Sequence, residues 1–137
     1  MIEESQLIEL LECAKKAREA AYAPYSKFAV GAALLAKNGK IYTGCNIENS
    51  SYGLSICAER AALFKAVSEQ VTEFVAIAIV ADTKGPVSPC GACRQALAEF
   101  SPNLVVLMSN LEKERKLKSL VELLPEAFTN QDLPSES

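Results

Sequence analysis

Apolar and polar residues follow one another along the chain in patterns that predict a series of helices and strands. Residues 5–22 carry leucine and alanine at helical spacing opposite a charged face, which predicts an amphipathic helix that Pro24 ends. Residues 28–36 and 40–45 predict two strands, and the Asn38-Gly39 pair between them is typical of a two-residue type I′ turn. We therefore expect an antiparallel hairpin here.

The middle of the chain predicts helices that alternate with strands. Residues 57–69 and 90–100 predict two helices. Residues 74–81 form an apolar run rich in β-branched side chains, typical of a strand covered on both faces, and residues 104–108 predict a fourth strand. This order favours helices packed on a sheet.

The last predicted strand, near residues 115–117, indicates how the sheet ends. Only about six residues separate it from the fourth strand, too few for the crossover that a parallel pair requires. We therefore expect these two strands to be antiparallel in a mixed five-stranded sheet, with the α/β class and a layered α/β/α architecture. Residues 119–124 predict a short helical turn.

Length and composition bound the possible functions. The 137 residues fit one domain, which we place at 1–129, and the polar residues 130–137 predict a frayed tail. A net charge of −3 disfavours nucleic-acid binding. No apolar stretch approaches the ~20 residues of a membrane span. The acidic first residues are not typical of a signal peptide, so we expect a cytoplasmic protein.

Cysteine and glutamate carry the chemistry of a chain that contains no histidine. Any zinc must then be bound by thiolates and carboxylates. The motifs are Cys57-x-Glu59 and Pro89-Cys90-x-x-Cys93. They match the three-cysteine form of the zinc nucleobase deaminase signature, in which the glutamate is an acid/base and not a ligand.

The predicted elements explain why these cysteines suit zinc. They lie at the starts of two predicted helices, where unpaired N–H groups and the helix dipole lower thiol pKa values. Three protein ligands leave a fourth position for water, as in catalytic zinc sites. Three thiolates give the site a net charge of about −1, which Arg60 or Arg94 could offset by donating to the sulfurs.

The two other cysteines, and the Cys-x-x-Cys motif taken alone, allow other interpretations of the site. Cys45 could supply a fourth sulfur and close the site, and Cys13 is expected in the core beneath the first helix. A Cys-x-x-Cys pair also occurs in structural zinc sites and in redox proteins. A zinc-stabilised binding module and a thiol oxidoreductase are therefore competing interpretations, as are deaminases of nucleic acids or of blasticidin S.

Beyond the zinc motif, further segments resemble one family over nearly the whole chain, the small homotetrameric cytidine deaminases. The segments are Tyr22-Ala-Pro-Tyr-Ser26 with Phe28 and Val30-Gly-Ala32, Gly44-Cys-Asn-Ile-Glu-Asn49, and Leu123-Leu-Pro125 with Phe128. The resemblance implies hydrolytic deamination of cytidine and deoxycytidine to uridine and deoxyuridine plus ammonia, in pyrimidine salvage. The preference between the two nucleosides stays open.

The resemblance also implies roles for the metal motif. One Zn²⁺ per subunit would be bound by Cys57, Cys90 and Cys93. Glu59 would take a proton from the zinc-bound water, which attacks C4 of the pyrimidine as hydroxide, and would pass protons to N3 and the departing amine.

Substrate contacts and subunit contacts follow from the same resemblance. Asn46 and Glu48 would hold the ribose hydroxyls, Phe28 would pack on the pyrimidine, and the backbone at Ala58 would face its carbonyl. Two aromatic residues, Tyr52 and Phe128, resemble those that family members lend to neighbouring subunits. Ala61 departs from the family pattern, where a small hydroxyl-bearing residue is more usual.

Overall fold

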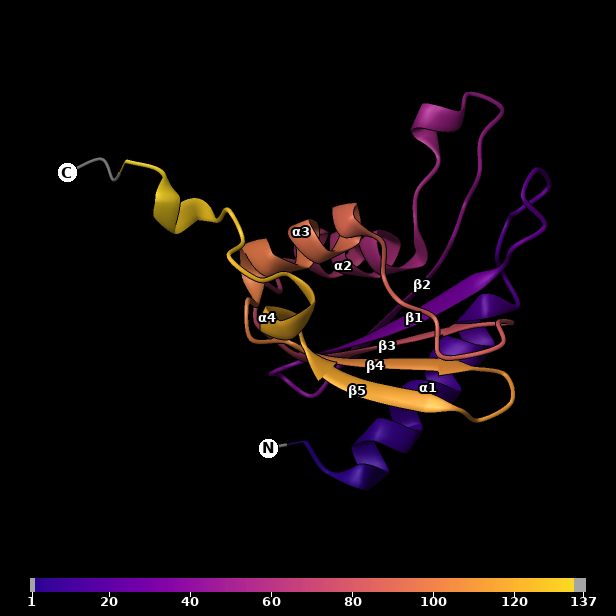
Figure 1. Ribbon diagram of the computed structural model, residues 1–137, viewed down its shortest axis with the longest axis horizontal. Coiled ribbons are helices and arrows are strands. Elements are labelled where there is room, and N and C mark those ends of the chain that lie inside the picture. The colour runs from indigo at the N-terminus through magenta and orange to yellow at the C-terminus, as the bar shows by residue number, and fades with distance from the viewer. Residues whose placement is uncertain (1, 135–137) are drawn as a thin grey trace.

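The computed structural model describes residues 2–134, which form a five-stranded mixed sheet between helices (Figure 1). The strand order is β2-β1-β3-β4-β5. The main elements along the chain are α1 (Glu4–Arg18), β1 (Val30–Ala36), β2 (Ile41–Cys45), α2 (Ala58–Ser68), β3 (Phe74–Ala81), α3 (Gly91–Phe100), β4 (Val105–Asn110), β5 (Arg115–Ser119) and α4 (Leu120–Leu123), with short 3₁₀ turns at Tyr52–Leu54 and Asn130–Asp132.

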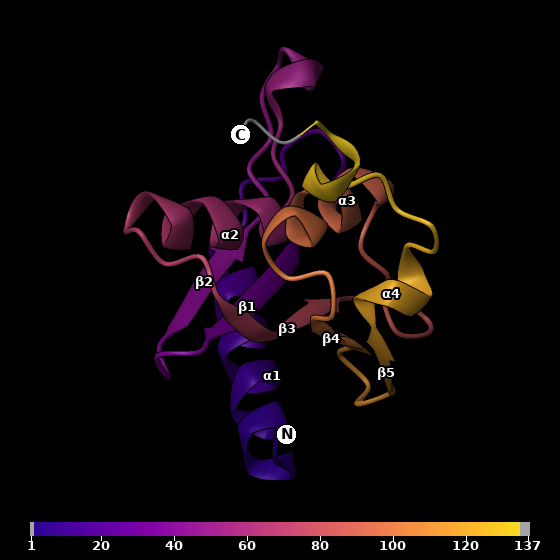
Figure 2. The ribbon, with the colours of Figure 1, turned by 90° about the vertical axis from the view of Figure 1, so that its left-hand side faces the viewer.

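The sheet separates two hydrophobic layers. Helix α1 covers one face, and α2 and α3 cover the other (Figures 1 and 2). Strand side chains alternate between the layers: Ile77 and Ile79 pack with α2 and α3, whereas Ala76, Ala78 and Val80 pack with α1. Strand β3 is therefore apolar at successive positions because both of its faces are buried, which confirms the layered α/β/α prediction.

The strand pairings follow the predicted topology. Strands β1 and β2 are antiparallel, β3 and β4 are parallel with α3 as their crossover, and β4 and β5 are antiparallel. The prediction that the last two strands are antiparallel is confirmed. Ser119 caps α4 by accepting a hydrogen bond from the Glu122 N–H, which confirms the short helical turn.

The hairpin between β1 and β2 differs from the predicted type I′ turn. The Gly39 N–H donates to the Ala36 carbonyl, and the Ala36 N–H donates to the Lys40 carbonyl, so the loop has three residues. Within this loop only Gly39 has a positive φ, of 89°, whereas type I′ needs two such residues. The Asn38 side chain instead accepts a hydrogen bond from the Lys40 N–H at 2.8 Å and holds the wider loop.

Two predicted boundaries move because of long-range backbone pairing. The first helix ends at Arg18 and not at residue 22, since the Tyr22 N–H donates to the Asn46 carbonyl and the Tyr22 carbonyl accepts from the Glu48 N–H. The first strand begins at Val30, two residues later than predicted. Both changes place the segment before β1 against the polar loop that follows β2.

The described part of the chain ends shortly after a 3₁₀ turn. Residues 130–132 form a 3₁₀ turn, and the last three residues of the predicted tail, 135–137, lie outside the described residues. The domain boundary at residue 129 and the fraying of the tail stay predictions. Within residues 2–134, every helix is too short or too polar to cross a membrane.

Gly44 sets how closely α2 approaches the sheet. A Cβ atom at this position would lie 2.5 Å from the Ala58 carbonyl oxygen and 2.5 Å from the Ala62 nitrogen, both backbone atoms of α2. Because backbone cannot rotate away as a flexible side chain can, any side chain at this position pushes the helix outward. Gly44 therefore seats the first turn of α2, which follows Cys57.

We predict that Gly44→Ala destabilises the protein by about 1–3 kcal/mol, the usual cost of overpacking a tight contact. The matched control is Gly85→Ala, because a Cβ there meets no atom within 4 Å. Chemical denaturation of both variants measures the difference. Equal free energies of unfolding for the two would show that α2 is not seated by Gly44.

Candidate active site

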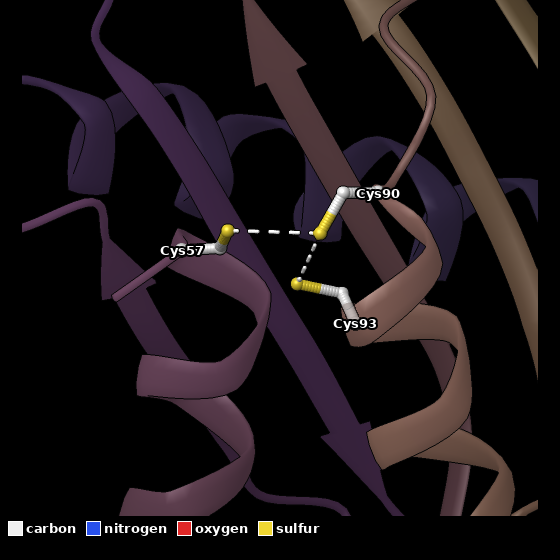
Figure 3. Close-up of side chains that lie close together, drawn as sticks. All are labelled: Cys57, Cys90 and Cys93. Carbon is white, nitrogen blue, oxygen red and sulfur yellow. Dashed lines mark hydrogen bonds between the residues drawn. The ribbon is translucent and has the colours of Figure 1, made fainter. Parts of the chain in front are cut away.

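Three cysteine sulfurs meet where α2 and α3 begin (Figure 3). Cys57 is the N-cap residue of α2, Cys90 is the N-cap residue of α3, and Cys93 lies in the first turn of α3. The Sγ atoms of Cys57 and Cys90 are 3.8 Å apart, and those of Cys90 and Cys93 are 3.4 Å apart. All three lie within 4.8 Å of one another, so one ion can reach them all.

The surroundings of the sulfurs favour negative charge on Cys57. Its hydrogen bond with Cys93 and the donation from Arg60 lower its pKa to about 5, although burial opposes the change. The pKa of Cys93 is raised, because its proton is held by the Cys57 sulfur and because the residue is buried. The two thiols therefore titrate as a coupled pair, in which Cys57 carries the negative charge and Cys93 keeps its proton. A bound cation replaces the remaining protons.

The two arginines beside the motif have different contacts. The Arg60 Nη2 lies 3.4 Å from the Cys57 sulfur, as expected for a group that offsets thiolate charge. Arg94 does not contact a sulfur, and its candidacy as a donor to them is wrong. It donates instead to the Pro89 carbonyl, the Ser88 hydroxyl and the Leu123 carbonyl, and so braces the loop before Cys90.

The remaining two cysteines stand apart from this cluster. Cys45 ends β2 opposite Gly31 and does not belong to the group of metal-ligand side chains found among residues 2–134. Cys13 is partly buried beside the hydrophobic layer under α1, and burial raises the pKa of its thiol. Three sulfurs, soft donors that zinc accepts in tetrahedral sites, therefore form the candidate metal site.

Glu59 lies one residue inside α2 and is nearly enclosed. Its side chain is 4% exposed, and it shares the first turn of the helix with Arg60. Burial raises the pKa of Glu59 to about 7, with a smaller contribution from the negative charge of Cys57. A carboxyl group with this pKa can both accept and donate a proton near neutral pH.

A cavity of about 370 Å³ connects the metal cluster to the predicted substrate residues. This volume is in the usual range of small-molecule sites. The predicted residues that line it are Phe28, Asn46, Glu48, Cys57, Ala58, Glu59, Arg60 and Cys90, and those without a predicted role are Ser26, Val30, Ser55, Ile56, Ile79, Val87 and Ser88. Residues from five separate stretches of sequence, 26–30, 46–48, 55–60, 79 and 87–90, thus share one cavity.

Polar side chains hold the outer wall of this cavity. Asn46 accepts a hydrogen bond from the Val30 N–H at 2.8 Å and donates to the Phe28 carbonyl at 2.7 Å. Glu48 accepts from the backbone N–H groups of Tyr25 and Ser26 and from the Ser26 hydroxyl. These donors, with the Ser26 hydroxyl first, lower the pKa of Glu48.

Ser26 is the main residue that sequence reasoning missed. It lies in the Tyr22-to-Ser26 segment, but no role was predicted for it. Its position in the sequence could have predicted a role, because a serine hydroxyl can accept a hydrogen bond from the backbone N–H two residues later, here that of Phe28. The Phe28 N–H does donate to the Ser26 oxygen, at 3.0 Å.

The two aromatic residues predicted to serve neighbouring subunits lie outside the cavity. Tyr52 is 75% exposed on the arm that carries the first 3₁₀ turn, which projects from the body of the molecule (Figure 2). Its ring centroid is 5.9 Å from that of Tyr25. Phe128 is 61% exposed in the segment after α4. Neither residue lines the cavity that holds Glu59, although Tyr52 shares a neighbouring pocket with Glu48.

Comparisons with known proteins agree with this arrangement. The family described as "Cytidine and deoxycytidylate deaminase zinc-binding region" matches residues 4–109. The cytidine deaminase of Sporosarcina psychrophila is 58% identical over 91% of this chain and 93% of its own length. That of Halalkalibacterium halodurans is 57% identical over 90% of this chain and 95% of its own length.

Solved structures give the same result. The crystal structure of cytidine deaminase from Burkholderia pseudomallei has a TM-score of 0.87 and 50% identity, covering 93% of this chain and all of its own. That of cytidine deaminase from Mycobacterium tuberculosis has a TM-score of 0.78 and 38% identity, covering 93% of this chain and 98% of its own. The predicted family and the zinc cofactor are confirmed: this chain belongs to the zinc-dependent cytidine and deoxycytidylate deaminases.

Proposed function

We propose that this chain catalyses the hydrolytic deamination of cytidine and deoxycytidine to uridine and deoxyuridine, releasing ammonia in pyrimidine salvage. The observation that carries the proposal is a single cavity that joins Glu59 and the cysteine cluster to Phe28, Asn46 and Glu48. One end offers a proton-transfer group beside a metal site, and the other offers an aromatic ring and polar groups. The relatives named cytidine deaminase support this substrate class.

The chemistry assigns Glu59 the proton transfers. Cys57, Cys90 and Cys93 would hold the zinc, which would supply a Lewis acid that makes water a nucleophile near neutral pH. Attack at C4 gives a tetrahedral centre whose amine leaves as ammonia only after it is protonated. Glu59, with a pKa of about 7, accepts one proton of the attacking water and passes it to N3. It then accepts the proton of the new C4 hydroxyl and passes it to the amine, so that C4 becomes a carbonyl as ammonia leaves.

The residues on the outer wall would orient the nucleoside. Phe28 would pack on the pyrimidine ring, and the backbone at Ala58 would face its carbonyl group. The side chains of Asn46 and Glu48 would bind the sugar hydroxyls. A free base would leave the remaining hydrogen-bonding positions of these two side chains unfilled, so we expect nucleosides to be favoured over cytosine.

An assay of four compounds separates this proposal from its competitors. The loss of cytosine absorbance is followed with cytidine, deoxycytidine, cytosine and blasticidin S. Turnover of the two nucleosides supports the proposal, whereas turnover of blasticidin S alone would assign a different substrate. A zinc-stabilised binding module or a thiol oxidoreductase would turn over none of the four.

We predict that Glu59→Gln binds zinc normally but loses deaminase activity by about 10²–10⁴-fold or more, since the variant keeps the shape of the side chain and loses its proton-transfer function. Steady-state rates with cytidine and metal analysis of the same preparation provide the measurement. Near-normal turnover would exclude Glu59 as the acid/base.

Arg60 is proposed to make the zinc more electrophilic by donating to the Cys57 sulfur. We predict that Arg60→Gln lowers kcat at least about tenfold in protein that still contains one zinc per chain. Lys116→Gln, the same charge change on an exposed position of β5, serves as the control and should keep wild-type kcat. Unchanged turnover of zinc-loaded Arg60→Gln would refute this role.

The active assembly is proposed to be a homotetramer in the cytoplasm, in which Tyr52 and Phe128 complete the sites of neighbouring subunits. Their exposure away from their own cavity supports this arrangement. Sedimentation should give a particle of four chains, each of 14.7 kDa. A monomer at the enzyme concentrations of the assay, with full activity, would remove the shared-site proposal.

A further inference from the structure

The first turn of α3 connects the metal loop to the segment that follows α4. Arg94, the residue after Cys93, donates to the Pro89 carbonyl at 2.9 Å and to the Ser88 hydroxyl at 2.8 Å, just before Cys90. Its third donor reaches the Leu123 carbonyl at 2.6 Å. One guanidinium group therefore fixes both the loop that carries a metal ligand and the start of the C-terminal segment.

Gln95, the next residue, extends this connection to Phe128. Its Nε2 donates to the Phe128 carbonyl oxygen at 2.6 Å. Across residues 2–134, this is the only hydrogen bond recorded between residues 125–128 and the rest of the chain. The segment crosses beside α3 and then extends away from the body of the molecule (Figure 1).

The side chain of Phe128 adds little packing to this single hydrogen bond. The Phe128 side chain is 61% exposed, so its ring is not fixed by the core of its own chain. Helix α3, by contrast, is anchored by its buried residues Cys93, Leu97 and Ala98. The position of Phe128 relative to the metal centre thus depends on the amide of Gln95.

We propose that Gln95 is a positioning residue for the substrate pocket of a neighbouring subunit. By holding the Phe128 backbone against the metal-binding helix, it sets where the aromatic ring enters the adjacent site. Arg94 secures the base of the same segment. The inference rests on the proposed function, in which Phe128 contributes to a neighbour's site, and it assigns a role to a residue outside every cavity wall described above.

The test compares Gln95→Ala with Glu99→Ala. Glu99 is one turn further along α3, is exposed, and its side chain makes no hydrogen bond recorded within the described residues. For Gln95→Ala we expect the KM for cytidine to rise about three- to tenfold, as for the loss of one hydrogen bond, with kcat and zinc content within about twofold of wild type. A KM equal to that of Glu99→Ala, or a parallel loss of zinc, overturns the proposal.

Mixed assemblies test whether the effect crosses the subunit boundary. Gln95→Ala chains are co-expressed with an excess of Glu59→Gln chains under separate affinity tags, and assemblies carrying both tags are purified. Only the Gln95→Ala chains then have an active Glu59, and most of their neighbours are Glu59→Gln chains with an intact Gln95. The KM of the mixed assembly should therefore return to the wild-type value. A KM that stays raised places the effect within one chain and overturns the inference.

The two proposals fail in different ways. If the proposed deamination is wrong, the wild-type protein itself is inactive on all four compounds. If only the inference is wrong, the wild-type protein is active and Gln95→Ala matches it in KM.

Discussion

The structure depends on the meeting of two helix N-termini over one end of the sheet. Cys57 and Cys90 occupy the N-cap positions of α2 and α3, so three sulfurs lie within 4.8 Å of one another. Negative charge is tolerated there because unpaired N–H groups and the Arg60 guanidinium face it. Glu59 lies buried in the first turn of α2 beside this cluster, and its burial raises its pKa to about 7. The metal cluster and the buried Glu59 therefore both depend on the position at which α2 begins.

The fold was predictable wherever local pattern and burial agree. Residues 74–81 form a strand with the predicted bounds, because both faces are buried and the apolar run ends where burial ends. The short connection before β5 sufficed to predict an antiparallel pair. Residues 19–22 were wrongly placed in a helix, since their helical pattern cannot reveal that the Tyr22 backbone pairs with Asn46 and Glu48.

Within the site, sequence spacing located the metal cluster and Glu59, but it could not distinguish the two arginines. Arg60 follows Cys57 by three positions and Arg94 follows Cys90 by four, and both spacings place the side chain near its cysteine on a helix. Tertiary acceptors decide between them, because the carbonyl of Leu123 draws Arg94 away from the sulfurs. Contacts with segments distant in sequence, including that of Gln95 with Phe128, have no local signal.

Counting the hydrogen bonds of Asn46 and Glu48 shows how the polar wall is preorganised. A carboxylate offers about four acceptor positions, and the donors from Tyr25 and Ser26 occupy three of those of Glu48. The Asn46 amide donates one of its two hydrogens to Phe28 and accepts from Val30. These side chains are thus fixed before any ligand arrives, which reduces the entropic cost of binding.

The hydrogen-bonding positions that remain free on Asn46 and Glu48 determine which chemical groups these side chains can bind. Glu48 can still accept one hydrogen bond, and Asn46 can still donate one and accept one. A hydroxyl group can donate to Glu48 and accept from Asn46 at once, whereas a group that only accepts hydrogen bonds leaves the free position of Glu48 unpaired. Sugar hydroxyls can fill both roles, which supports the proposal that Asn46 and Glu48 bind the sugar of a nucleoside.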